Sequence, residues 1–292
     1  MTRPGMDLVR PPAGATDLVL LAHGGMENSQ AVPQSWQPPI LRMWPFAWAV
    51  RTAVPAAAIG LMRYRYRGWN GVAADPAVDL RTVLDDLPPV IRRVVLIGHS
   101  MGGRAVVAAG DHPRVAGVLA LAPWLPPGEP LTALRPPITL AHGTEDTITD
   151  PRATAAYAER LRSAGTPVRF FQLAGETHPM LRRHNDWNTL VADFTTAALA
   201  TPSTAAGANQ SPEPPAQSPE PPAQSPEPPA NPFPGPGAAP SSGPDDRDVL
   251  LPRSGRSSTA GAVLSIAVAR LRLPVVARCS AGKGTAAGKD LG

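Results

Sequence analysis

Covalent cross-links are absent from this 292-residue sequence. It contains a single cysteine, Cys279, so no intrachain disulfide can form. A stretch of about 200 residues is long enough to bury a self-sufficient hydrophobic core, so the fold requires neither a disulfide nor a structural metal. Because a chain without disulfides is typical of a reducing compartment, we expect a cytoplasmic protein.

Long apolar runs and a strong charge of one sign are also missing. The most apolar later segments, residues 41–58 and 260–276, are each interrupted by arginine and proline, and residues 1–16 hold no apolar stretch of signal-peptide length. Lys and Arg number 27 against 23 Asp and Glu, which gives a net charge of only +4. The composition therefore predicts no stable membrane span, no secretion signal and no nucleic-acid partner.

Aromatic residues make up only 5% of the chain, and their distribution divides it. Every Trp and Tyr and all six His lie in residues 1–200, whereas residues 201–292 contain one aromatic residue, Phe233. Residues 210–230 are three copies of QSPEPPA, a proline density that favours extended chain without a packed core. We therefore predict one folded domain over residues 1–200 and a disordered, Pro-rich tail over residues 201–292, whose partner the sequence does not identify.

The folded part alternates between two kinds of pattern. Short, continuously apolar runs typical of strands buried on both faces occur at residues 18–22, 94–97, 115–122, 138–141 and 168–173. Helical patterns occupy residues 45–52, 76–87, 101–109, 151–163 and 179–199, and we expect Asp75 and Asp150 to cap two of them. This alternation predicts an α/β fold with a mostly parallel central sheet and helices on both faces.

The strongest functional signal is Gly-His-Ser-Met-Gly at residues 98–102, between a predicted strand and a predicted helix. Small residues at Gly98 and Gly102 permit a tight strand-to-helix turn that pushes the Ser100 hydroxyl outward, and the helix N-terminus favours developing negative charge. With this motif in this context, residues 17–199 resemble the α/β-hydrolase superfamily, in which such a serine is the nucleophile.

The resemblance implies an acid and a histidine in the loops that follow the last two strands. It assigns Asp146 as the acid and His178 as the base of a Ser-His-Asp triad, with Glu145 as the alternative acid. His184 falls inside the predicted last helix, where a solvated surface position is the simpler expectation. We expect His99 and His142, next to glycine at strand ends, to bond loop backbone.

Residues 23–26, His-Gly-Gly-Met, follow the first predicted strand and resemble the oxyanion loop of the superfamily. The resemblance assigns the backbone amides of Gly25 and Met101 as the two oxyanion donors, with Met26 as the fallback for Gly25. Only about a dozen residues, 124–136, connect two strands where many relatives insert a helical lid. A lidless, open pocket lined by Trp124, Trp36 and Met26 is therefore expected.

Together these features predict a serine hydrolase that cleaves a small-molecule carboxylic ester or thioester through an acyl-enzyme intermediate. The chemistry requires no metal and no organic cofactor. Two alternatives stay open: an acyltransferase that uses the same triad, and a non-catalytic hydrolase-fold scaffold that binds partners through its Pro-rich tail.

Overall fold

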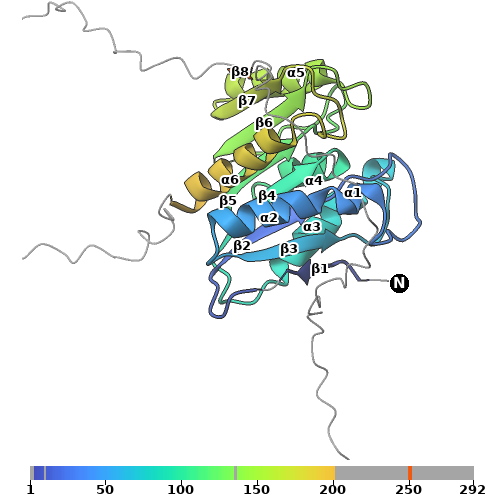
Figure 1. Ribbon diagram of the computed structural model, residues 1–292. Helices are drawn as coiled ribbons and strands as arrows, with labels where there is room; N and C mark the ends of the chain where they lie inside the picture. The colour runs from blue at the N-terminus through green and yellow to red at the C-terminus, as the bar shows by residue number, and fades with distance from the viewer. Residues whose placement is uncertain (1–2, 10, 135–136, 201–248, 252–292) are drawn as a thin grey trace, which may run out of the picture. The chain divides into compact units, whose positions relative to one another are not determined.

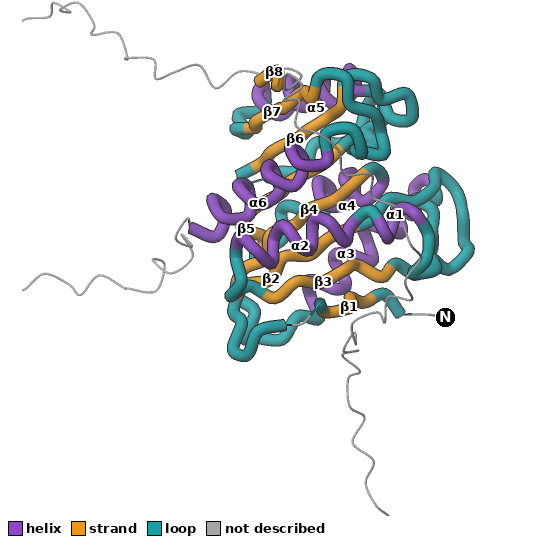
Figure 2. The backbone as a smooth tube through the Cα atoms, viewed as in Figure 1, coloured by secondary structure: helices purple, strands orange, loops and turns teal. Residues whose placement is uncertain are grey.

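The computed structural model describes residues 3–9, 11–134, 137–200 and 249–251, which form one sheet with helices on both faces (Figures 1 and 2). The strands are β1 (Gly5–Leu8), β2 (Asp17–Ala22), β3 (Ala58–Arg63), β4 (Arg93–His99), β5 (Val115–Leu121), β6 (Ile138–Gly143), β7 (Val168–Leu173) and β8 (Val249–Leu251). The helices are α1 (Pro38–Leu41), α2 (Met43–Ala53), α3 (Asp75–Asp85), α4 (Met101–Ala108), α5 (Pro151–Ser163) and α6 (His184–Ala200), with a 3-10 turn, η1, at Gly71–Ala73.

The strands of this sheet lie in the order β1-β3-β2-β4-β5-β6-β7-β8. Only β1 runs antiparallel to its neighbour, and every other pair is parallel. The predicted α/β class with a mostly parallel sheet is therefore confirmed. Parallel strands end at a common edge, so the loops after β2, β4, β6 and β7 meet there, as in other open α/β sheets.

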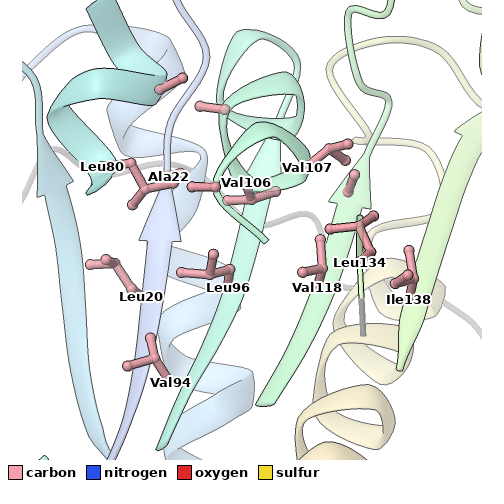
Figure 3. Packing of buried hydrophobic residues seen from close by; sticks show 14 of the residues in the cluster. Leu20, Ala22, Leu80, Val94, Leu96, Val106, Val107, Val118, Leu134 and Ile138 are labelled. Carbon is pink, nitrogen blue, oxygen red and sulfur yellow. The ribbon is translucent and has the colours of Figure 1, made fainter. Parts of the chain in front are cut away.

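The core consists of two apolar layers, one on each face of the sheet. Along β4, Val94 and Leu96 contribute to one layer while Val95 and Ile97 contribute to the other, and all four are 0% exposed. The first layer packs against α3, α4 and α5. Figure 3 shows part of it, with Leu80 of α3 and Val106 of α4 on the same side of the sheet as Leu96. The second packs against α2 and α6, which lie on the near side of the sheet in Figure 1. Burial on both faces explains why the strand sequences are continuously apolar and do not alternate with polar residues. Each large apolar side chain buried in this way stabilises the fold by roughly 1.5–3 kcal/mol.

Two of the predicted helix starts need correction. Asp75 does not cap α3, because it is the first helical residue and Ala74, with φ 45°, is the cap. The Asp75 carboxylate instead accepts hydrogen bonds from Arg65 and Asn70. The last helix begins at His184 rather than residue 179. At α5 the prediction is confirmed, since the Asp150 side chain accepts a hydrogen bond from the backbone N–H of Arg152.

One short strand lies inside the segment that we predict to be a tail. Residues Val249–Leu251 form β8, which pairs in parallel with β7 at the edge of the sheet. The Arg183 guanidinium donates a hydrogen bond of 2.8 Å to the carbonyl of Leu251, which ties this strand to the start of α6. The other residues of 201–292, including the QSPEPPA repeats, lie outside the described residues. None of the helices in the described ranges is long and apolar enough to cross a membrane.

Candidate functional site

Ser100 lies at the tight turn between β4 and α4, with φ 57° and ψ −119°. A residue with a side chain rarely adopts positive φ, so the neighbouring structure must hold this conformation. The Ser100 N–H donates to the carbonyl of Leu121 at 3.0 Å, and the Ser100 carbonyl accepts from the N–H of Trp124 at 3.1 Å. A side chain at Gly98 would meet the carbonyl of Gly102, so this turn requires glycine.

Three predicted site residues from three different loops form one hydrogen-bonded chain. The Nε2 atom of His178 lies 3.1 Å from Oγ of Ser100, and the Nδ1 atom of the same ring lies 2.8 Å from Oδ2 of Asp146. Because an ionised carboxylate only accepts, Nδ1 carries the proton and Nε2 is left free to accept the Ser100 hydroxyl. This geometry can remove a proton from Ser100 and return it later.

The Asp146 carboxylate is buried but heavily hydrogen-bonded. Its Oδ1 accepts from the backbone N–H groups of Ile148 at 2.8 Å and Thr149 at 3.0 Å, while Oδ2 also lies 3.1 Å from Nε2 of His142. Burial alone would raise the pKa of Asp146, but the hydrogen bonds with His142, His178 and Thr149 outweigh it and hold the pKa well below its usual range. Asp146 is therefore a carboxylate at neutral pH and stays one in moderate acid.

The other acids and histidines near this chain occupy different environments. Glu145 forms a half-exposed ion pair with Arg182. His184 is exposed at the first residue of α6. His99 is buried, and its Nε2 lies 3.1 Å from the backbone carbonyl of His178. Burial, and then the charge of His178, lower the pKa of His99 to about 3, so His99 is neutral.

His142 and two threonines belong to this site but were not predicted for it. We expected His142 to bond loop backbone, which is wrong, because its two ring nitrogens contact the side chains of Thr154 and Asp146. Thr149 lies three residues after Asp146, and its Oγ1 lies 2.9 Å from Oδ2. An Asp side chain that accepts from the backbone N–H groups two and three residues later forms a turn that is typical of Asp. This turn is a recognisable sequence signal, and it favours Asp146 over Glu145 as the acid.

The loop after β2 passes directly beside Ser100. A Cβ atom built on Gly24 would lie 3.2 Å from Cβ of Ser100, and one built on Gly25 would lie 2.6 Å from Sδ of Met101. The Met26 N–H donates to the carbonyl of Arg67 at 2.8 Å, so this amide is already used. The amides of Gly25 and Met101 have no acceptor among the described residues, as is usual for Met101 at the first position of a helix.

The three residues predicted to line a pocket differ in exposure. Met26 is 48% exposed and Trp36 is 69% exposed. Trp124 is half-buried, 6.4 Å from the ring of Trp69 and 4.8 Å from the guanidinium of Arg104. Residues 122–134, the described part of the connection after β5, contain no helix, which agrees with the absence of a helical lid there. Within the described residues, no group of three or more His, Cys, Asp or Glu side chains is arranged to hold a metal ion.

The model of the "Alpha/beta hydrolase family" matches residues 19–276. The solved structure of esterase PE8 is 16% identical, with a TM-score of 0.51 over 66% of this chain and 100% of that one. ATU1826 from Agrobacterium tumefaciens is 13% identical, with a TM-score of 0.53 over 66% and 90%. The alpha/beta hydrolase enzyme MGS-M1 from a Medee basin deep-sea metagenome library is 16% identical, with a TM-score of 0.51 over 64% and 86%. A search of curated proteins gave no match. At these identities the structural likeness concerns the fold alone.

Proposed function

Because the chain belongs to the alpha/beta hydrolase family, we propose that it is a serine hydrolase that cleaves a carboxylic ester or thioester through an acyl-enzyme intermediate. The observation that carries the proposal is the chain from Oγ of Ser100 through His178 to Asp146, with distances of 3.1 and 2.8 Å. Three side chains from separate loops have no structural need to meet in this order, whereas nucleophilic catalysis requires it.

In the proposed reaction, Oγ of Ser100 attacks the carbonyl carbon of the ester while Nε2 of His178 accepts the hydroxyl proton. The Asp146 carboxylate holds the ring in the tautomer with the proton on Nδ1 and stabilises the imidazolium that forms. The imidazolium then gives its Nε2 proton to the leaving alcohol or thiol. A water molecule that loses its proton to His178 then attacks the acyl carbon. The bond between that carbon and Oγ of Ser100 breaks, the imidazolium returns the proton to Oγ, and the acid is released.

We assign the backbone amides of Gly25 and Met101 to the oxyanion that develops during both attacks. Both N–H groups belong to segments in contact with each other beside Ser100, and neither has another acceptor among the described residues. The Met26 amide donates to the carbonyl of Arg67, so it is not available as the fallback donor. The Met26, Trp36 and Trp124 side chains remain our proposal for contacts with the acyl or alcohol group.

Gly25→Ala tests the oxyanion assignment. The added methyl group would meet the carbonyl of Arg67 and Sδ of Met101, so the loop must shift and carry its amide away from the oxyanion. We expect kcat to fall by about 10²- to 10³-fold, as for the loss of one oxyanion donor in other hydrolases, with a smaller change in KM. Gly5→Ala on β1 is the control, because a Cβ atom there meets only the flexible end of the Arg63 side chain, which can move aside. A fully active Gly25→Ala enzyme would show that this amide is not a donor.

Covalent labelling tests the proposed function directly. A fluorophosphonate probe reacts with an activated serine, so wild-type protein is expected to gain one adduct on the peptide that contains Ser100, and Ser100→Ala is expected to gain none. Ser163→Ala, at an exposed residue at the end of α5, is the matched control and should label as the wild type does. Absence of labelling in folded wild-type protein would favour the non-catalytic scaffold. Product analysis with and without an added alcohol or amine then separates hydrolysis from acyl transfer.

A further inference from the structure

His142 makes two side-chain hydrogen bonds in the centre of the site, although the proposed mechanism gives it no step. It is the penultimate residue of β6, and its side chain is 0% exposed. Its Nδ1 lies 2.8 Å from Oγ1 of Thr154 on α5, and its Nε2 lies 3.1 Å from Oδ2 of Asp146. The ring therefore spans the distance between a core helix and the carboxylate that orients His178.

The hydrogen-bond partners of His142 determine which of its ring nitrogens carries the proton. If the proton were on Nδ1 alone, the lone pair of Nε2 would face the Asp146 carboxylate at 3.1 Å, and two acceptors would oppose each other in a buried place. With the proton on Nε2, that atom donates to Asp146 and the Thr154 hydroxyl donates to Nδ1. The Thr149 hydroxyl does not alter this assignment, because its oxygen lies nearer to Oδ2 of Asp146, at 2.9 Å, than to Nε2 of His142, at 3.2 Å.

We infer that His142 is a positioning residue of the proposed reaction: its Nε2–H donates to Oδ2 of Asp146 and holds that carboxylate against Nδ1 of His178. The inference rests on the proposed function, since a carboxylate needs this precision only if it orients a working base. His142 does not reach the reacting atoms itself. It acts through Asp146, whose Oδ2 lies between the two imidazole rings at 3.1 and 2.8 Å.

The second donor also changes the electrostatics of the pair. A carboxylate that shares its negative charge with two N–H groups stabilises the His178 imidazolium less than one that faces His178 alone. Loss of the His142 donor is therefore expected to move the acid limb of the pH–rate profile to higher pH. The other titratable or charged side chains nearby are His99 on β4, Arg42 before α2, whose charge acts on His99, and Glu176 before His178. None of them is altered by the test.

Two polar substitutions separate the proposed donor from simple packing. The side-chain amide of His142→Gln reaches the position of Nε2 and can donate to Asp146, whereas that of His142→Asn reaches only the position of Nδ1 and can bond Thr154. We expect His142→Asn to lower kcat by about 10- to 100-fold, in the range found when an orienting partner is lost. The acid-side pKa of its kcat/KM profile is expected to move upward. His142→Gln is expected to stay within about threefold of wild type, with a pKa near that of wild type.

The readouts are ester hydrolysis across pH and thermal unfolding of each variant. Equal activities and equal acid-side pKa values for the Asn and Gln variants would overturn the inference, as would reduced activity with an unmoved pKa in His142→Asn. Should His142→Asn fail to fold, His142→Met fills the space without a donor and must give the same loss and the same upward shift. Failure of the proposed function is a different result, namely a wild-type protein that neither labels at Ser100 nor hydrolyses any ester.

Discussion

Replacing His178 by alanine is expected to lower kcat for ester hydrolysis by on the order of 10⁶-fold, the loss seen when a serine hydrolase loses its base. Nε2 of His178 lies 3.1 Å from Oγ of Ser100, and His99, the other ring beside it, is buried, neutral and bonded to backbone. No other histidine among the described residues is placed to accept the Ser100 proton. Asp146→Asn is expected to cost about 10⁴-fold, because an amide supports the wrong tautomer of His178.

Two matched controls accompany these variants. His184→Ala removes an exposed imidazole six residues along the chain, and Glu145→Gln removes the neighbouring acid that pairs with Arg182. Both are expected to keep activity within about twofold of wild type, since surface substitutions away from a site change little. Initial rates with p-nitrophenyl acetate give the comparison. If Glu145→Gln lost as much activity as Asp146→Asn, the acid of the triad would have to be reassigned.

The pH dependence of the wild-type rate follows from the same contacts. The hydrogen bonds to Asp146 hold its pKa well below the usual range, so its charge persists as pH falls. Stability that depends on this carboxylate is present above its unfolded pKa and is lost only as pH falls through the lower, folded value. The loss of activity in moderate acid is therefore expected to have a cause other than protonation of Asp146.

The turn at Ser100 and the strands around it could be predicted because their signals are local. Continuous apolar runs mark β2, β4 and β7 within one or two residues of the observed bounds, and the pair Gly98 and Gly102 marks a turn that only small residues permit. Ser100 follows from this turn, and Asp146 and His178 follow from the resemblance and the order of the loops. Only the tertiary fold brings Ser100, Asp146 and His178 into one hydrogen-bonded chain. Each of them nevertheless lies in the loop that follows a strand, and strand ends can be predicted.

The missed elements lack such local signals. The strand β3 begins only a few residues after α2, so Ala58–Arg63 reads as the end of one apolar stretch, and periodicity cannot divide it. The strands β1 and β8 have four and three residues, and each is defined by a partner far along the chain. The role of His142 depends on Thr154, which another element supplies. Contacts between residues far apart in the chain are the feature that a single sequence indicates least.

Replacing Arg104 by methionine is expected to lower the free energy of unfolding by about 3–5 kcal/mol, the usual cost of removing one partner of a buried ion pair. Arg104 lies one helical turn after Ser100 on α4. Its Nε donates to Oε1 of Glu129 at 2.8 Å and its Nη2 lies 2.6 Å from Oε2, with the two side chains only 12% and 7% exposed. The guanidinium also stacks on Trp69, 3.8 Å from the ring centroid. Without Arg104, the Glu129 charge stays buried without its main partner.

Urea unfolding of Arg104→Met measures this cost, and Arg3→Met is the matched control. The Arg3–Asp86 pair has a similar separation of 2.7 Å, but its side chains are 70% and 49% exposed, so its loss is expected to cost less than about 1 kcal/mol. The double variant Arg104→Met with Glu129→Leu is expected to recover much of the loss, because no buried charge remains. Equal destabilisation by Arg104→Met and Arg3→Met would mean that burial does not increase the cost of breaking the Arg104–Glu129 pair.

Arg104 also ties the connection after β5 to the turn at Ser100. Glu129 and Trp124 both belong to this connection, and the Trp124 N–H donates to the Ser100 carbonyl. Arg104→Met is therefore expected to lose activity at urea concentrations below those that unfold the sheet.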